Sequence, residues 1–221
     1  YVVTNQHVLA GAERFSLETL NGTKLKPLGF EIVADQDLAR LRFRPEKGGG
    51  VKPLKLYTGA LAEGREVIAV GDSGGKGVSV RLEGKILGVG AKKIEVDAGF
   101  VQGNSGGPII DVTTGRVMGV VVYITREALT WTNAETRFGG QVRRFAERLT
   151  PNTPWVDVDY EKYQRQACLA GDWSSFVNDC AAAVDVLNRG PGLYPPTRKN
   201  YHNRRVYSRT SAYYKAARKP G

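Results

Sequence analysis

The residues with the clearest chemical potential lie in the stretch Val101 to Ile110, which reads Val-Gln-Gly-Asn-Ser-Gly-Gly-Pro-Ile-Ile. Ser105 is a potential nucleophile in this stretch. A serine hydroxyl is weak alone, so it needs a base within hydrogen-bond reach, an acid that orients the base, and donors aimed at the developing oxyanion. The glycines around Ser105 allow a tight turn and a close approach of a substrate main chain. An ordinary glycine-rich hairpin loop is the alternative interpretation of this stretch when it is taken alone.

The choice of a base is narrow, because the chain has only two histidines. His202 lies in a basic tail, where it is most simply a solvated polar residue. His7 follows the strand-like run Tyr1 to Val3 and begins a short helical turn. A single histidine at such a place is more often structural, but chemistry that needs a base leaves His7 as the candidate.

Two carboxylates compete for the role of the orienting acid. Asp37 directly precedes the run Leu38 to Phe43, whose alternation is typical of a half-buried strand, whereas Asp35 lies in the preceding turn. The side chain of Asp37 is therefore held at the mouth of a strand, and we favour it. The chain order is then His7, Asp37 and Ser105, which is the chymotrypsin order among the unrelated arrangements of this triad.

Many short strands are predicted to position these residues, with Asn21-Gly22 joining two of them in a hairpin. Further strand-like runs cover residues 66–70, 78–87, 92–96, 108–112 and 117–124. Almost no helix intervenes, which indicates an antiparallel barrel or sandwich. Residues 141–149 are an exception. Their apolar spacing of i, i+3 and i+7, at Val142, Phe145 and Leu149, predicts one face of a short amphipathic helix.

A second serine lies in a similar sequence, Gly71-Asp72-Ser73-Gly74-Gly75. Lys76 stands where the stretch around Ser105 has proline. Ser73 also follows Asp37 by only 36 positions, which is too few to complete one barrel and enter a second. We therefore interpret Ser73 as part of a loop that connects two strands.

Three motifs occur in the same order as in a known family. They are Tyr1-Val2-Val3-Thr4-Asn5-Gln6-His7-Val8-Leu9, then Asp37-Leu38-Ala39-Arg40-Leu41, and finally Ile94-Glu95-Val96-Asp97-Ala98 leading into Gly103-Asn104-Ser105-Gly106-Gly107-Pro108. Residues 1 to about 149 thereby resemble the trypsin-like serine endopeptidases, and most closely those of the bacterial HtrA/Deg type, which carry asparagine before the serine.

The resemblance implies an all-β fold of two antiparallel six-stranded β-barrels, with the triad in the cleft between them. The strands that precede the histidine segment in the family are absent here, so the first barrel is expected to be incomplete at its amino terminus. We assign residues 1–50 to the remainder of this barrel and residues 51–150 to the second barrel with its terminal helix. A helical extension at residues 151–194 and a basic, disordered tail at residues 195–221 are expected to follow, and no PDZ domain is expected.

The same resemblance implies roles for individual residues. His7 would take the proton of Ser105 and later give it to the leaving amine, while Asp37 fixes the imidazole tautomer. The main-chain N–H groups of Gly103 and Ser105, with Asn104 between them, would form the oxyanion hole. The substrates would be polypeptides. Export to the periplasm or the cell exterior is favoured by the resemblance alone.

A specificity pocket can also be inferred by analogy with the family. Trypsin-like enzymes that cleave after Arg or Lys carry an acid six positions before the nucleophile, and Gly99 occupies that position here. Cleavage after basic residues is therefore not expected. A pocket floored by Gly99 and walled by Val121, Val122 and Tyr123 should prefer small or medium apolar side chains.

The composition is that of a globular protein, and the longest apolar run, residues 117–124, is far short of the roughly 20 residues of a membrane-spanning helix. Cys168 and Cys180 make neither a zinc cluster nor a redox pair, so no metal or cofactor is expected. The net charge of +10 comes mainly from residues 195–221, which hold eight basic and no acidic residues and leave +2 for the rest (10 − 8).

The tyrosine-bearing basic tail, residues 195–221, suits an anionic partner such as nucleic acid, anionic lipid or an acidic polymer. A solvated tail without a partner is the alternative. Two functional classes thus stay open: an active serine endopeptidase, and a catalytically impaired protease-fold module that binds or scaffolds through its tail. The complete triad favours the first class, and the absent amino-terminal strands favour the second.

Overall fold

The computed structural model describes residues 1–171, apart from residues 11, 13–14, 47–50, 132–133 and 137. Residues 172–194 of the predicted helical extension and the predicted basic tail lie outside the described residues. The chain divides into two compact units. The larger comprises Tyr1–Leu9 with Phe15–Val158, and the smaller comprises Ala10–Arg14 with Asp159–Gly221.

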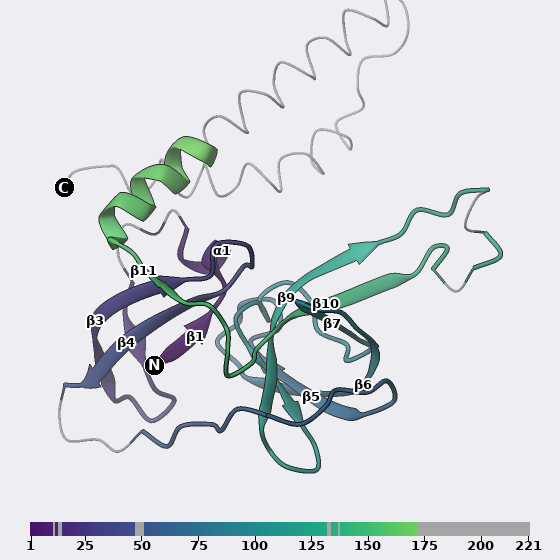
Figure 1. The fold of residues 1–221 in the computed structure, drawn as a ribbon, viewed down its shortest axis with the longest axis horizontal. Coiled ribbons are helices and arrows are strands. Elements are labelled where there is room, and N and C mark those ends of the chain that lie inside the picture. Colours follow the sequence, from purple (N-terminus) through teal and green to yellow (C-terminus); the bar gives the residue numbers. More distant parts are fainter. Residues whose placement is uncertain (11, 13–14, 47–50, 132–133, 137, 172–221) are drawn as a thin grey trace, which may run out of the picture. The chain divides into compact units, whose positions relative to one another are not determined.

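The larger unit begins with a curled five-stranded antiparallel sheet (Figure 1). Its strands are β1 (Val2–Thr4), β2 (Leu17–Glu18), β3 (Lys24–Ile32), β4 (Ala39–Pro45) and β11 (Val156–Asp157). They follow the order β1-β4-β3-β11, with β2 paired to the start of β3. The turn between β2 and β3 contains Asn21-Gly22, which confirms the predicted hairpin. This half-barrel matches the expected incomplete first barrel.

A closed barrel of six antiparallel strands forms the rest of the larger unit, in the order β10-β7-β6-β5-β8-β9. The strands are β5 (Glu66–Gly71), β6 (Val80–Val89), β7 (Lys93–Val96), β8 (Pro108–Asp111), β9 (Val117–Arg126) and β10 (Val142–Arg148). The second β-barrel predicted from the sequence is therefore confirmed. Its core is filled by inward-facing apolar side chains, among them Val67, Ile86, Ile94, Phe100, Ile109 and Met118.

A separate apolar cluster joins the curled sheet to the barrel. Val33 and Leu38, which flank the loop carrying Asp37, are fully buried against Val120 of β9 and Leu149. Burial of a side chain of this size contributes about 1.5–3 kcal/mol. The loop is therefore held in place from both of its ends.

The prediction of an amphipathic helix at residues 141–149 was wrong, because strand β10 occupies this segment. Val142 and Phe145 are three positions apart, so in the strand their side chains point to opposite faces, and Leu149 follows the end of the strand. The apolar spacing that imitates a helical period therefore combines residues that do not share one face of β10. Pairing with both β7 and β9 supplies the main-chain hydrogen bonds that a helix would otherwise make.

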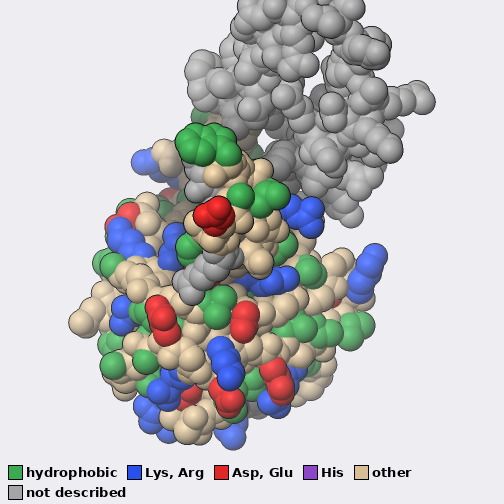
Figure 2. Space-filling view, turned by 90° about the vertical axis from the view of Figure 1, so that its right-hand side faces the viewer, with side chains coloured by type: hydrophobic (Ala, Val, Ile, Leu, Met, Phe, Trp, Pro, Cys, Tyr) green, Lys and Arg blue, Asp and Glu red, His purple; other side chains and the backbone are tan. Residues whose placement is uncertain are grey.

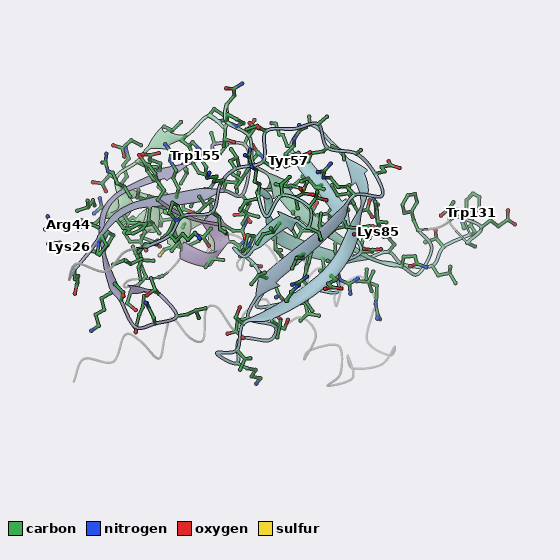
Figure 3. All side chains as sticks on the ribbon, turned by 90° about the horizontal axis from the view of Figure 1, so that it is seen from below. Lys26, Arg44, Tyr57, Lys85, Trp131 and Trp155 are labelled. Carbon is green, nitrogen blue, oxygen red and sulfur yellow. The ribbon has the colours of Figure 1, made fainter. Side chains whose placement is uncertain are left out.

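Strands β9 and β10 continue beyond the barrel as a long hairpin (Figure 1). Trp131 lies at the far end of this hairpin, away from the barrel, and is 92% exposed (Figure 3). At the opposite side of the unit, Lys26 of β3 lies beside its strand partner Arg44 of β4 (Figure 3). On the face of the described residues shown in Figure 2, basic and acidic side chains are interspersed.

The smaller unit contains a helix at residues 160–171, within the segment that was predicted to be helical. Asp159 caps it, because the Oδ1 atom accepts a hydrogen bond from the main-chain N–H of Lys162 at 2.7 Å. The Tyr160 hydroxyl donates to the Ala12 carbonyl at 3.0 Å. Among the described residues, no helix is long and apolar enough to cross a membrane.

Candidate active site

The loop that carries Asp37 is tied to the start of α1 (Gln6–Leu9) by three consecutive residues. The side-chain amide of Asn5 donates to the main-chain carbonyl of Asp37 at 2.8 Å. The amide of Gln6 donates to the carbonyls of Val33 and Gln36, at 2.7 Å in both cases. The main-chain N–H of His7 donates to Asp37 Oδ1 at 3.0 Å. These hydrogen bonds therefore hold the loop against α1 independently of any contact made by the imidazole ring.

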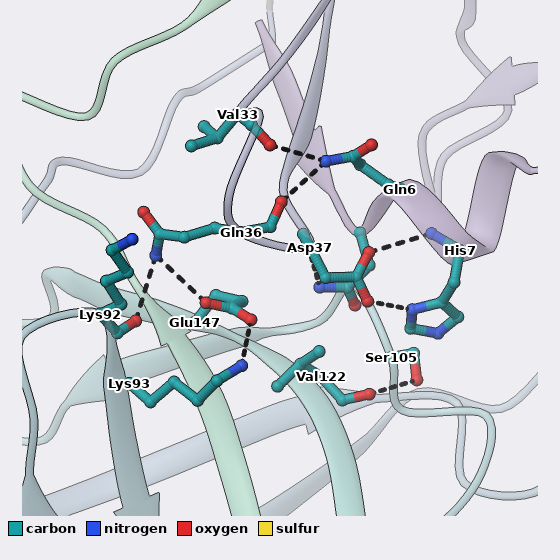
Figure 4. A network of polar contacts seen from close by, with 11 residues as sticks. Gln6, His7, Val33, Gln36, Asp37, Lys92, Lys93, Ser105, Val122 and Glu147 are labelled. Atoms are coloured by element: carbon teal, nitrogen blue, oxygen red, sulfur yellow. Dashed lines mark hydrogen bonds and ion pairs between the residues drawn. The ribbon is translucent and has the colours of Figure 1, made fainter. Parts of the chain in front are cut away.

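The imidazole of His7 is bound to the carboxylate of Asp37, with Nδ1 and Oδ2 2.5 Å apart (Figure 4). Burial alone would raise the pKa of Asp37, but hydrogen bonds from the His7 ring and from main-chain N–H groups outweigh it, and the pKa is lowered. An ionised carboxylate accepts only, so the neutral ring donates through Nδ1 and leaves Nε2 as an acceptor. The competing carboxylate, Asp35, is paired with Lys92 on the surface instead.

Ser105 lies in a tight turn directly before β8. The main-chain N–H of Gly106 donates to the carbonyl of Val121 at 3.0 Å. Gly106 has φ +86°, and a Cβ there would collide with the hydroxyl of Thr4 at the end of β1. A glycine is therefore required at this position. It lets the nucleophile turn pack against the segment that leads, three residues later, to His7.

The hydroxyl of Ser105 is turned toward β9, where it donates to the Val122 carbonyl at 3.3 Å. Figure 4 shows the ring of His7 and the side chain of Ser105 in the same region, with the hydroxyl directed to Val122. Catalytic hydrogen bonds are often long or misaligned before substrate binds.

The side chain of Asn104 is directed into the protein. It is fully buried, and its Oδ1 accepts hydrogen bonds from the Val101 N–H and the Ser73 hydroxyl, each at 3.0 Å. Within the described part of the chain, the main-chain N–H groups of Gly103 and Ser105 have no acceptor. An oxyanion hole requires two unpaired N–H donors of this kind at the reacting serine.

The loop that contains Ser73 connects β5 and β6, as predicted from the sequence. It packs against the nucleophile turn, because the N–H of Gly74 donates to the carbonyl of Gln102 at 2.8 Å. The next residue of the turn, Gly103, has φ +99°, and a Cβ there would collide with the main chain of this loop. Ser73 therefore supports the nucleophile turn through Asn104. The sequence alone gave no sign of this contact.

The residue before Asp37 ties the same loop to the barrel (Figure 4). The Gln36 side-chain amide donates to the Lys92 carbonyl and to Glu147 Oε2, both at 3.1 Å. Glu147 is 1% exposed, and its other oxygen is 2.6 Å from Lys93 Nζ. A buried carboxylate is stable only with such partners. The network fixes the acid of the His7–Asp37 pair relative to the barrel that carries Ser105.

The four residues predicted to form the pocket occupy different environments. Gly99 is exposed, with no heavy atom within 4 Å of the place where a Cβ would lie. Val122 is buried beside Ser105, whereas the side chain of Val121 belongs to the barrel core. Tyr123 is 39% exposed, and its ring packs 5.0 Å from that of Phe145.

Comparison with known proteins places this geometry in a family. The model described as "Trypsin-like peptidase domain" matches residues 1–120, which is more than half of the chain. The chain belongs to the trypsin-like peptidase family. Among curated relatives, "Probable periplasmic serine endoprotease DegP-like" of Brucella suis is 32% identical over 54% of this chain. "Serine protease Do-like HtrA" of Bacillus subtilis is 28% identical over the same share.

This trypsin-like domain spans only 25% and 29% of the length of those two relatives. Among solved structures, the HtrA-type protease AlgW with a decapeptide has a TM-score of 0.50 and 25% identity, covering 66% of this chain and 44% of that one. The serine endoprotease from Yersinia pestis has a TM-score of 0.51 and 24% identity over 74% of this chain and 53% of that one, which supports the fold alone.

Proposed function

We propose that this trypsin-like domain is a serine endopeptidase that acts through the triad His7, Asp37 and Ser105. The observation that carries the proposal is the 2.5 Å contact between His7 Nδ1 and Asp37 Oδ2, in a segment against which the Ser105 turn packs through Thr4. Family membership supports the same conclusion.

The proposed reaction uses each group in turn. His7 Nε2 takes the proton from Ser105 as Oγ attacks the carbonyl carbon of the substrate peptide, and the imidazolium is stabilised by Asp37. The N–H groups of Gly103 and Ser105 bind the resulting oxyanion, each worth on the order of 3 kcal/mol. His7 then protonates the leaving amine. Water activated by His7 hydrolyses the acyl-enzyme.

We place the substrate side chain that precedes the scissile bond over Gly99, beside Val122 and Tyr123 of β9. No carboxylate stands at Gly99 to attract a basic side chain, so cleavage after Arg or Lys is not expected. By analogy with the family, a small or medium side chain is expected there. The residues predicted to line this pocket, taken by themselves, favour an apolar substrate side chain.

Labelling with an organophosphonate tests the proposal, because this probe phosphonylates only an activated serine. Mass spectrometry should locate the adduct on Ser105 in the 221-residue chain. The adduct should be absent from Ser105→Ala and His7→Ala. The matched variant Ser73→Ala should still be labelled on Ser105, about fivefold more slowly, because one hydrogen bond of about 1 kcal/mol to Asn104 is lost. An adduct on Ser73, or one that persists in Ser105→Ala, would contradict the assignment.

A binding or scaffold module without turnover is the second candidate. One observation favours it: the Ser105 hydroxyl is bonded to the Val122 carbonyl and not to His7. The labelling experiment separates the two functions, since an impaired module would acquire no adduct under conditions in which a protease does. The polypeptide substrates and an exported location are likewise proposals, supported by the names of the relatives.

A further inference from the structure

Two adjacent arginines on β10 differ in their partners. Arg143 is paired with Glu95 through two hydrogen bonds of 2.8 Å each. Arg144 is half-buried, and its Nε donates to the main-chain carbonyl of Phe100 at 2.9 Å. Within the described residues it has no acidic partner.

The side chains of Arg143 and Arg144 point to opposite faces of β10. Arg143 lies over the ring of Phe145, 5.0 Å from its centroid, so these two residues share one face. Successive side chains of a strand point to opposite faces. Arg144 therefore reaches the other face, where it contacts the segment that leads into the nucleophile turn.

The contacts of Arg144 place its guanidinium at the proposed substrate pocket. Phe100 directly follows Gly99, where the space for a Cβ is empty. On the other side, Arg144 is paired in register with Ile124 of β9. Ile124 lies two residues, or about 7 Å, beyond Val122, whose carbonyl accepts the Ser105 hydroxyl. The guanidinium is thus bonded to the residue that follows Gly99, and it comes from a strand that pairs with the one carrying Val122.

The unused hydrogen-bonding capacity of Arg144 indicates what the pocket binds. A guanidinium has five N–H donors in a fixed fork, and among the described residues only the Nε group of Arg144 has an acceptor, the Phe100 carbonyl. A half-buried cation without a counterion is unfavourable. A carboxylate matches the remaining pair of Nη groups with two parallel, charge-assisted hydrogen bonds.

We infer that Arg144 makes the pocket selective for an acidic side chain, aspartate or glutamate, immediately before the scissile bond. The inference rests on the proposed endopeptidase function. The expected substrate side chain is still small or medium in size. The inference replaces its expected apolar character with a negative charge.

Matched fluorogenic peptides that differ only at this position test the inference. In the 221-residue chain, kcat/KM should be at least about tenfold higher for Asp over Asn and for Glu over Gln, and higher for Asp than for Ala or Val. Arg144→Gln should remove this ratio. Arg144→Lys, which keeps the charge but not the fork, should retain part of it. Arg126→Gln removes an exposed positive charge on β9 and should leave the ratio unchanged.

A binding measurement separates this inference from the proteolytic function. Fluorescence anisotropy of the same peptides on Ser105→Ala should show about tenfold tighter binding of Asp than of Asn, and Ser105→Ala/Arg144→Gln should show none of this difference. Organophosphonate labelling of wild type and Arg144→Gln on Ser105 reports catalytic competence independently. If labelling succeeds but apolar peptides are preferred, or if the ratio survives Arg144→Gln, the inference is overturned and the endopeptidase proposal stands. If labelling fails, the binding difference still decides the role of Arg144.

Discussion

Replacing Ser105 with alanine should lower kcat/KM for peptide hydrolysis by about 10⁶-fold, because it removes the atom that forms the acyl-enzyme. The base and its orienting acid stay in place without a nucleophile to activate. The remaining hydrolysis would come from water held near the oxyanion donors. Turnover of a fluorogenic peptide by wild type and variant, at equal concentrations of folded chain, measures the difference.

Loss of the Ser105 hydroxyl should leave the fold intact, because that hydroxyl makes a single hydrogen bond of 3.3 Å to the Val122 carbonyl. The midpoint of thermal unfolding should therefore change little. The exposed Ser79 is a matched control, and Ser79→Ala should retain wild-type turnover. Residual hydrolysis by Ser105→Ala that Ser73→Ala abolishes would instead identify the loop between β5 and β6 as the source of the nucleophile.

Most strands could be predicted from the sequence, because each is a short apolar run between turn residues. The alternating run at residues 38–43 and the strand-like run at residues 66–70 correspond to β4 and β5. Strand β10 could not, because its apolar residues Val142 and Phe145 lie on opposite faces and together imitate a helical spacing. Its pairing with β7 and β9, which makes it a strand, depends on residues far away in the sequence.

The candidate catalytic residues could be selected from the sequence because their motifs are local. His7, Asp37 and Ser105 each lie in a short stretch with a recognisable context of glycines and strand residues. The residues that support them are not local. Gln36 meets Glu147 across 111 positions of the chain, and Ser73 meets Asn104 across 31.

Arg144 was not among the residues that the sequence suggested for the pocket, because its contact is not local either. Arg144 reaches Phe100 only because β10 closes the barrel beside β7 and β9. In the sequence it belongs to a basic segment that resembles an amphipathic helix. Closure of the barrel, which is a tertiary event, therefore decides which main-chain segment Arg144 contacts.

The replacement Asp37→Asn should lower kcat by about 10⁴-fold at neutral pH while the site keeps its shape. In the wild type, one carboxylate oxygen accepts from the His7 main-chain N–H and the other faces Nδ1. The main-chain N–H can only donate, so the single oxygen of asparagine must stay with it. The NH₂ group then faces Nδ1, which forces the ring proton onto Nε2. In that tautomer His7 cannot take the proton of Ser105.

The pH dependence distinguishes this tautomer effect from general damage. Because the pKa of Asp37 is lowered, its carboxylate stays ionised throughout the range in which histidine side chains titrate. As the pH falls from neutrality, wild-type turnover should therefore not be lost through protonation of Asp37 until the pH is below the ordinary pKa of an aspartate side chain. Asp37→Asn should not recover wild-type turnover anywhere in the range in which histidine side chains titrate, since its neutral ring is still the wrong tautomer.

Asp35→Asn is the matched control for Asp37→Asn, since it removes a carboxylate two positions away that pairs with Lys92 on the surface. Exposed ion pairs contribute little, so its turnover should stay within about twofold of wild type. Thermal unfolding of both variants checks that the loop between Val33 and Leu38 is retained. Should Asp37→Asn keep more than a tenth of wild-type kcat, His7 would have to be oriented by its main-chain anchoring alone, and the carboxylate would have no role in setting the tautomer.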